Sequence, residues 1–132
     1  EDYAKSNKLK MLAYVRGMAI SGCSPEIMGI GPVVSSQKAL KRAALKLEDM
    51  DIIEMNEAFA AQSLACVDEL GIDMSKLNIH GGALAMGHPL GASGARITGK
   101  AASLLQNNSA RYALSTMCVG GGQGCATILE RA

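Results

Sequence analysis

The sequence predicts one α/β domain over residues 1–132, in which helices pack on a mixed β-sheet and a C-terminal β-hairpin closes the fold. Short apolar runs that are typical of strands alternate with segments whose apolar spacing is typical of helices. The chain ends with two strand-like runs joined by glycines, which is the pattern of a hairpin. Hydrophobic residues make up 48% of the chain and aromatic residues only 3%, so we expect a closely packed core of small and aliphatic side chains.

The first third of the chain predicts a strand, a loop and a helix. Residues Leu9–Ile20 are rich in Met, Leu, Val and Ala, and they predict a strand that enters the core. Residues 21–34 contain Gly and Pro repeatedly and predict a loop. A helix is expected to begin at Ser35 or Ser36, which are good N-cap residues, and to end near Leu47.

The rest of the chain predicts further strands and helices before the hairpin. A short apolar run, Asp49–Met55, predicts a buried strand and leads into a helix over Asn56–Gly71, whose final glycine is a typical helix end. A brief strand is expected at 76–82 and a helix at Gly91–Asn107, and the hairpin occupies Arg111–Arg131. This order of elements implies a mixed sheet covered by helices.

Composition and charge exclude several classes of protein. The net charge of +1 gives no electrostatic footprint for nucleic acid, and no apolar run reaches the roughly 18 residues that cross a membrane. The four cysteines form no CxxC pair and the chain has two His, so we expect no metal site. Free thiols predict a reducing compartment, here the cytoplasm. The chain begins at Glu1 rather than Met, so we expect a piece of a longer protein.

Three polar residues occupy positions where open α/β sheets place their ligands. Asn56 lies at a strand-to-helix junction, His88 lies in the glycine-rich stretch 78–96, and Cys118 ends a strand before "VGGGQG". Imidazole and thiol groups exchange protons near neutral pH, and glycines after Cys118 leave backbone N–H groups free to stabilise an oxyanion. These groups together indicate acyl-transfer or carbanion chemistry at a carbonyl.

Each of these residues also has a purely structural interpretation. Asn56 could be a helix N-cap, His88 could belong to a tight turn, and Cys118 could be a small buried hydrophobic residue. The glycines could serve only the hairpin turn. The run Gly120–Gly124 does not match GxGxxG and no helix follows it, which disfavours a dinucleotide site.

Three segments resemble the C-terminal signatures of thiolases, in the family's order and with similar separations. They are "NEAFAAQ" (56–62), "GGALAMGHPLGASGAR" (81–96) and "CVGGGQG" (118–124), and "MGIGPVVSSQKAL" also resembles the family's loop ahead of a helix. The likeness covers nearly the whole chain, which therefore resembles the C-terminal half of a thiolase. Ketoacyl synthases share the fold, but their equivalent site uses two His, so the Asn, His and Cys set here points away from them.

The resemblance implies a role for each candidate residue. Thiolases join or cleave acyl chains as coenzyme A thioesters, through an acylated Cys and a Claisen condensation or its reverse. His88 would activate the nucleophile and donate to the thioester oxygen, and Asn56 would hold a water in the same oxyanion hole. Cys118 would move the proton of the substrate α-carbon or the coenzyme A thiol, and the Gly120 N–H would help form a second oxyanion hole.

The resemblance also implies how the substrate lies. Ala58 and Phe59 would line the pantetheine channel and Met28 would lie near the acyl pocket, although Phe59 could instead pack in the core. Coenzyme A thioesters would be substrates, with no separate cofactor and no metal. A homo-oligomer is expected, because thiolases resemble one another in being dimers or tetramers.

One departure from the family separates two functional hypotheses. The family's nucleophilic Cys lies in an N-terminal half that this chain lacks, as does its loop domain, and Cys23 and Cys66 lie in other contexts. The first hypothesis is an enzyme half that needs an N-terminal partner carrying the nucleophile and is inactive alone. The second is a catalytically silent binding or assembly module. Smaller departures are His80, where the family usually has Asn, and Met86, where it usually has another aliphatic residue.

Overall fold

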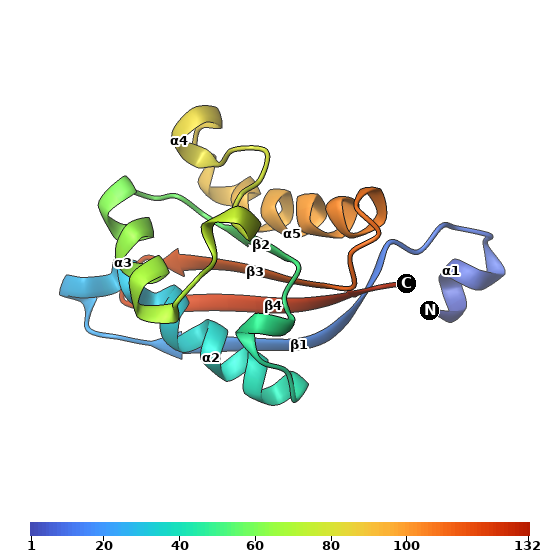
Figure 1. Cartoon of the computed structure of the whole chain (residues 1–132), viewed down its shortest axis with the longest axis horizontal. Coiled ribbons are helices and arrows are strands. Elements are labelled where there is room, and N and C mark those ends of the chain that lie inside the picture. The colour runs from blue at the N-terminus through green and yellow to red at the C-terminus, as the bar shows by residue number, and fades with distance from the viewer.

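A four-stranded mixed sheet forms the centre of the computed structural model, which describes residues 1–132 (Figure 1). The strands lie in the order β1-β4-β3-β2; β1 pairs antiparallel with β4, β4 antiparallel with β3, and β3 parallel with β2. Their bounds are β1 (Ala13–Gly22), β2 (Ile52–Met55), β3 (Tyr112–Val119) and β4 (Gln123–Arg131). The mixed sheet and the closing β3–β4 hairpin are therefore confirmed.

Helices cover both faces of the sheet, and each face has its own core. One face packs against α2 (Gly31–Ala43) and α3 (Ala60–Leu70), and the other packs against α5 (Leu90–Asn107) (Figure 1). Because side chains alternate along a strand, Ile53 joins the first core and Ile52 the second. The remaining helical segments are α1 (Asp2–Ser6), α4 (Ala83–Met86), η1 (Pro25–Ile30), η2 (Leu47–Asp49) and η3 (Met74–Lys76). None of the helices combines the length and apolar character needed to cross a membrane.

The prediction that a helix begins at Ser35 or Ser36 is wrong, because α2 already begins at Gly31 and ends at Ala43. Pro32 lies in the first turn, where a helix needs no N–H donor, so this proline starts the helix rather than a loop. A side chain at Gly31 would collide with the backbone of Gln123, so the helix start packs directly on β4. Both serines are buried inside the helix.

The brief strand expected at 76–82 is also wrong. Leu77 makes one isolated parallel bridge to Ile53, and the pairing stops at Asn78, whose φ is 44°. Beyond this point the Asn78 side chain, rather than the backbone, bonds to β2. It accepts from the Met55 N–H at 3.0 Å and donates to the Met55 carbonyl at 2.9 Å. A side-chain amide thus replaces a strand at the end of β2.

The other predicted elements are present with shifted bounds. The first strand starts at Ala13 rather than Leu9, and α5 matches the predicted third helix within one residue. The helix expected from Asn56 begins only at Ala60 and ends where predicted, with Gly71 in the left-handed conformation. Asn56 therefore lies in the connection between β2 and α3 and faces the site.

Candidate active site

His88 lies between two helices, in a stretch whose backbone requires glycine. Gly87 follows α4 with φ 85° and ψ 168°, a combination essentially restricted to glycine. Pro89 then occupies the N-cap position of α5. The glycine turns the chain away from α4 and the proline directs it into α5, which leaves His88 half-buried at the junction.

The hydrogen bonds of the His88 ring favour one tautomer. The Ser93 hydroxyl donates to the Pro89 carbonyl at 3.2 Å and lies 2.6 Å from His88 Nδ1. Because the single hydroxyl proton is already used, Ser93 accepts a hydrogen bond from Nδ1–H. The opposite nitrogen, Nε2, then carries the lone pair and accepts from the Asn56 amide at 3.3 Å. This assignment leaves Nε2 ready to take a proton.

Asn56 is not a helix N-cap. Phe59 occupies the N-cap position of α3 without a side-chain bond, and the Asn56 side chain turns instead toward His88. Asn56 is 1% exposed, and its Oδ1 has no hydrogen-bond partner within the chain. A buried amide oxygen without a partner is costly, so this atom is suited to bind a water or a polar group of a ligand.

Cys118 lies near the end of β3, opposite Gly124 of β4, and is 3% exposed. Burial raises the pKa of its thiol above the ordinary value, and the backbone hydrogen bond to the sulfur offsets only part of this shift. The thiol is therefore protonated at neutral pH. A protonated thiol suits a proton donor better than an attacking nucleophile, which needs a thiolate.

A groove of about 360 Å³ brings most of the predicted site residues together. Its lining consists of Met28, Ala58, Phe59, His88, Leu90, Met117, Cys118, Val119 and Gly120. Asn56 does not line the groove and reaches it through His88. Phe59 is 71% exposed, so the alternative that it packs in the core is wrong. The groove has the volume and the mainly apolar lining of a small-molecule site.

The glycines between β3 and β4 do not all serve the turn. Gly121 and Gly122 have φ of 83° and 86°, and a side chain at Gly122 would collide with Cys23. Gly120 has no positive φ, and a side chain there would point into open space. The hairpin turn thus requires glycine at 121 and 122. The conformation and packing of the chain do not require glycine at 120.

The sequence analysis did not predict a role at the site for three residues, Ser93, Glu57 and Asn78. The Glu57 carboxylate accepts from the Asn78 amide at 2.8 Å and from the Leu84 N–H at 2.9 Å, which ties α4 to the end of β2. A side chain at Gly82 would collide with this carboxylate. Closeness in sequence to the candidate residues could have indicated two of them. Glu57 follows Asn56 directly, and Ser93 comes five residues after His88, in the first turn of α5.

Comparison with known proteins decides the family. A family model described as "Thiolase, C-terminal domain" matches residues 9–131. The chain belongs to the thiolase family. This thiolase domain is 55% identical to a 3-ketoacyl-CoA thiolase of Vibrio parahaemolyticus over 99% of the chain and 34% of the relative. A 3-ketoacyl-CoA thiolase of Vibrio vulnificus is also 55% identical, and 35% of it is covered.

Solved thiolases have the same fold. The chain superimposes on human mitochondrial 3-ketoacyl-CoA thiolase, a structure also known in complex with CoA, with a TM-score of 0.97 and 49% identity. It superimposes on the Bacillus anthracis acetyl-CoA acetyltransferase with a TM-score of 0.96 and 42% identity. All of this chain and 34% of each solved chain are covered. The thiolase domain thus spans about a third of the length of the relatives it matches.

The four cysteines of the thiolase domain lie in different surroundings. Cys66 is buried in the core, and its thiol faces the Gly29 carbonyl at 3.4 Å. All four are free thiols, and only Cys118 lines the groove with His88. Neither Cys23 nor Cys66 faces His88 across the groove.

Proposed function

We propose that this chain is the C-terminal catalytic part of a thiolase that condenses acyl-CoA thioesters or cleaves 3-ketoacyl-CoA by thiolysis. The observation that carries the proposal is the convergence of His88, Cys118 and Gly120 on one groove, with Asn56 bonded to His88 behind it. The names of the relatives and the solved complex of one of them with CoA support coenzyme A thioesters as substrates.

The geometry suits His88 to activate a nucleophile. Its Nε2 lone pair takes the proton of a cysteine thiol supplied by the N-terminal part, and the resulting thiolate attacks the carbonyl carbon of the substrate. The imidazolium and a water held by Asn56 then donate to the oxyanion. The buried Asn56 Oδ1, which lacks a partner in the chain, supports the placement of that water.

The raised pKa of Cys118 suits its thiol to donate a proton to the enolate that forms when the substrate is cleaved. In thiolysis, the bond between the α- and β-carbons breaks, and the Cys118 thiol gives its proton to the enolate of the departing acetyl-CoA. The Cys118 thiolate then takes the proton of a second coenzyme A thiol, whose sulfur attacks the acyl-enzyme. Burial holds the thiol protonated at the start of this sequence, which supports the assignment. The Gly120 N–H would stabilise the enolate oxygen.

The N-terminal part of the enzyme is the partner that we propose. The chain spans about a third of its relatives, and its outer strand β1 exposes large apolar side chains, of which Val15 (58%), Met18 (60%) and Ile20 (64%) are the most exposed. Exposed apolar surface of this kind commonly marks a protein–protein contact. The four free thiols support a reducing, cytoplasmic location, and the likeness to thiolases supports a homo-oligomer.

A chimera tests this function. In it, this chain replaces the matching C-terminal third of the Vibrio vulnificus thiolase, which supplies the N-terminal part. We expect the chimera to cleave acetoacetyl-CoA in the presence of coenzyme A, and His88→Ala to slow enzyme acylation by about 10²- to 10⁴-fold. A folded, oligomeric chimera that binds coenzyme A without turnover would instead support a silent assembly module.

A further inference from the structure

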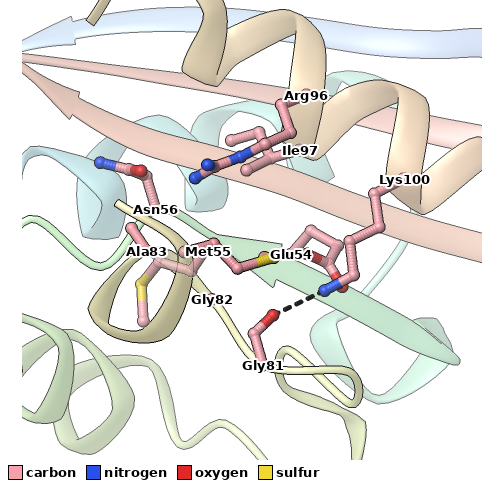
Figure 2. A pocket seen from close by; sticks show the side chains of 10 residues that line it. Glu54, Met55, Asn56, Gly81, Gly82, Ala83, Arg96, Ile97 and Lys100 are labelled. Carbon is pink, nitrogen blue, oxygen red and sulfur yellow. Dashed lines mark hydrogen bonds and ion pairs between the residues drawn. The ribbon is translucent and has the colours of Figure 1, made fainter. Parts of the chain in front are cut away.

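An ion pair with a buried carboxylate, Glu54–Lys100, lies beside Gly81 (Figure 2). Glu54 of β2, two residues before Asn56, is 2% exposed, and its Oε1 lies 3.0 Å from Nζ of Lys100 on α5. The same Nζ donates a hydrogen bond to the Gly81 carbonyl at 2.7 Å. Lys100 Nζ thus pairs with the Glu54 carboxylate and donates to the Gly81 carbonyl at the same time.

A second cation of α5 reaches the other end of the same segment. Arg96 lies one turn before Lys100, on the same side of the helix, and donates to the Gly87 carbonyl at 2.8 Å. Both side chains extend from α5 toward the loop in Figure 2. Gly81 and Gly87 bracket α4, and His88 comes directly after Gly87.

Apolar packing holds the bracketed segment only at Ala83, which is buried. Its two largest side chains, Leu84 and Met86, are 64% and 53% exposed. The remaining side chains of Gly81–Gly87 are those of Gly and Ala. Besides the bond of Glu57 to the Leu84 N–H and the bond of the Gly81 N–H to the Asn78 carbonyl at 2.7 Å, charged side chains hold the segment by its carbonyls.

We propose that Arg96 and Lys100 are positioning residues for His88, with Glu54 as the buried counter-ion of Lys100. Together they hold both ends of the Gly81–Gly87 segment, which keeps His88 Nε2 within reach of Asn56. This inference rests on the proposed function, because the position of Nε2 matters for turnover only in a thiolase. A displacement of about 1 Å in such a group can reduce the rate by about 10²-fold.

Two variants of the chimera test the proposal. Arg96→Met removes the bond to Gly87. Lys100→Met alone would leave the Glu54 charge buried without a partner, so it is combined with Glu54→Gln, which removes both charges. We expect both variants to fold and to lower kcat by about 10- to 100-fold while KM changes little. Arg96→Lys, which can still donate to Gly87, should recover part of the loss.

A matched control comes from Lys76, which does not line the groove and donates from Nζ to the carbonyls of Met50 at 2.7 Å and Glu48 at 3.2 Å. Lys76→Met removes the same kind of bond, and its kcat should stay close to that of the unchanged chimera. A wild-type kcat in the folded Glu54→Gln/Lys100→Met variant and in Arg96→Met would overturn the proposal. It would also be overturned if Lys76→Met lowered kcat as much as these variants.

A second readout does not depend on turnover. Nitrogen-15 NMR of the chimera, segmentally labelled in residues 1–132 only, observes just two histidines, His80 and His88. We expect His88 to be protonated at Nδ1 and to become a mixture of tautomers in Arg96→Met and in the double variant. An unchanged tautomer in both would contradict the positioning role. If the unsubstituted chimera lacks activity but these spectra change as expected, the proposed function fails and the positioning role stands.

Discussion

Ser93 selects the nitrogen of His88 that carries the proton. It is fully buried, and its hydroxyl accepts from Nδ1–H because its own proton goes to the Pro89 carbonyl. Ser93, five residues after the candidate base His88, thus contacts its ring without lining the groove.

We predict that Ser93→Ala leaves the helix intact and lowers kcat of the chimera by about tenfold, the equivalent of one hydrogen bond of about 1.4 kcal/mol. Alanine is a better helix former than serine, so α5 itself should not suffer. Ser103→Ala, at an exposed site of the same helix, is the control for the substitution itself. Equal kcat values for the two variants, measured by thiolysis of acetoacetyl-CoA, would show that Ser93 does not set the tautomer.

For Cys118, the two half-reactions should separate. We predict that Cys118→Ser in the chimera still forms the acyl-enzyme, because the nucleophile that we propose is a cysteine of the N-terminal part, but no longer exchanges the methyl hydrogens of acetyl-CoA with deuterated water. A serine hydroxyl is too weak an acid and base near neutral pH to replace the thiol. Exchange at the unsubstituted rate would mean that the buried thiol only fills space.

At the scale of elements, the long periodic segments were predictable and their starts were not. The strands, α5 and the end of α3 follow from apolar pattern and from Gly71. The start of α2 could not be predicted, because Gly31 and Pro32 are residues typical of loops. The packing of Gly31 against β4 is visible only in the folded structure. The residue types of the site were predictable from the sequence, whereas the bonds of Ser93 and Glu57 depend on how α4 and α5 meet β2.

The side chain of Asn78 makes the hydrogen bonds that a neighbouring strand would make at the end of β2. Removing it should therefore lower the stability of the fold. We predict that Asn78→Ala lowers the free energy of unfolding by about 2–4 kcal/mol, because three hydrogen bonds at a buried site are lost. Ser109→Ala is the control, since Ser109 also has a positive φ (53°) but is exposed. Urea unfolding of the 132-residue chain measures both, and equal losses would assign the effect to backbone conformation alone.

At the scale of the whole molecule, Glu54 makes stability depend on pH. Burial raises the pKa of its carboxyl above the ordinary value, and Lys100 offsets only part of this shift, with smaller opposing effects of His80 and Glu57. The folded state therefore holds the Glu54 proton more tightly than the unfolded state. The resulting stabilisation is complete below the unfolded pKa and is lost as the pH rises through the folded pKa.

We predict that the stability of the unsubstituted chain falls relative to that of Glu54→Gln as the pH is raised from about 4 toward neutrality. The glutamine side chain does not titrate, so the stability of this variant is the reference for that of the unsubstituted chain at each pH. Urea unfolding of both proteins at several pH values measures the difference. A difference that is constant with pH, or that grows in favour of the unsubstituted chain, would contradict the raised pKa.

The exposed apolar side chains of β1 lead to a prediction about assembly. Without the N-terminal part that we propose, the 132-residue chain should self-associate, because Val15, Met18 and Ile20 lack a covering partner. It should also not cleave acetoacetyl-CoA, because the proposed nucleophile is absent. Sedimentation of the pure chain and a thiolysis assay measure both properties. A monomer with turnover would overturn both expectations and would make Cys118 the candidate nucleophile.

The position of β4 in the sheet has a consequence for how the chain folds during synthesis. β4 is the last of the four strands to leave the ribosome, yet it lies between β1 and β3, and it pairs Ala13 with Arg131. Until β4 emerges, β1 has no neighbouring strand, and its apolar residues stay accessible to other nascent chains and to chaperones. Contacts between residues so far apart in sequence also form slowly. We therefore expect the sheet to close only after β4 has left the ribosome, and aggregation competes with folding until then.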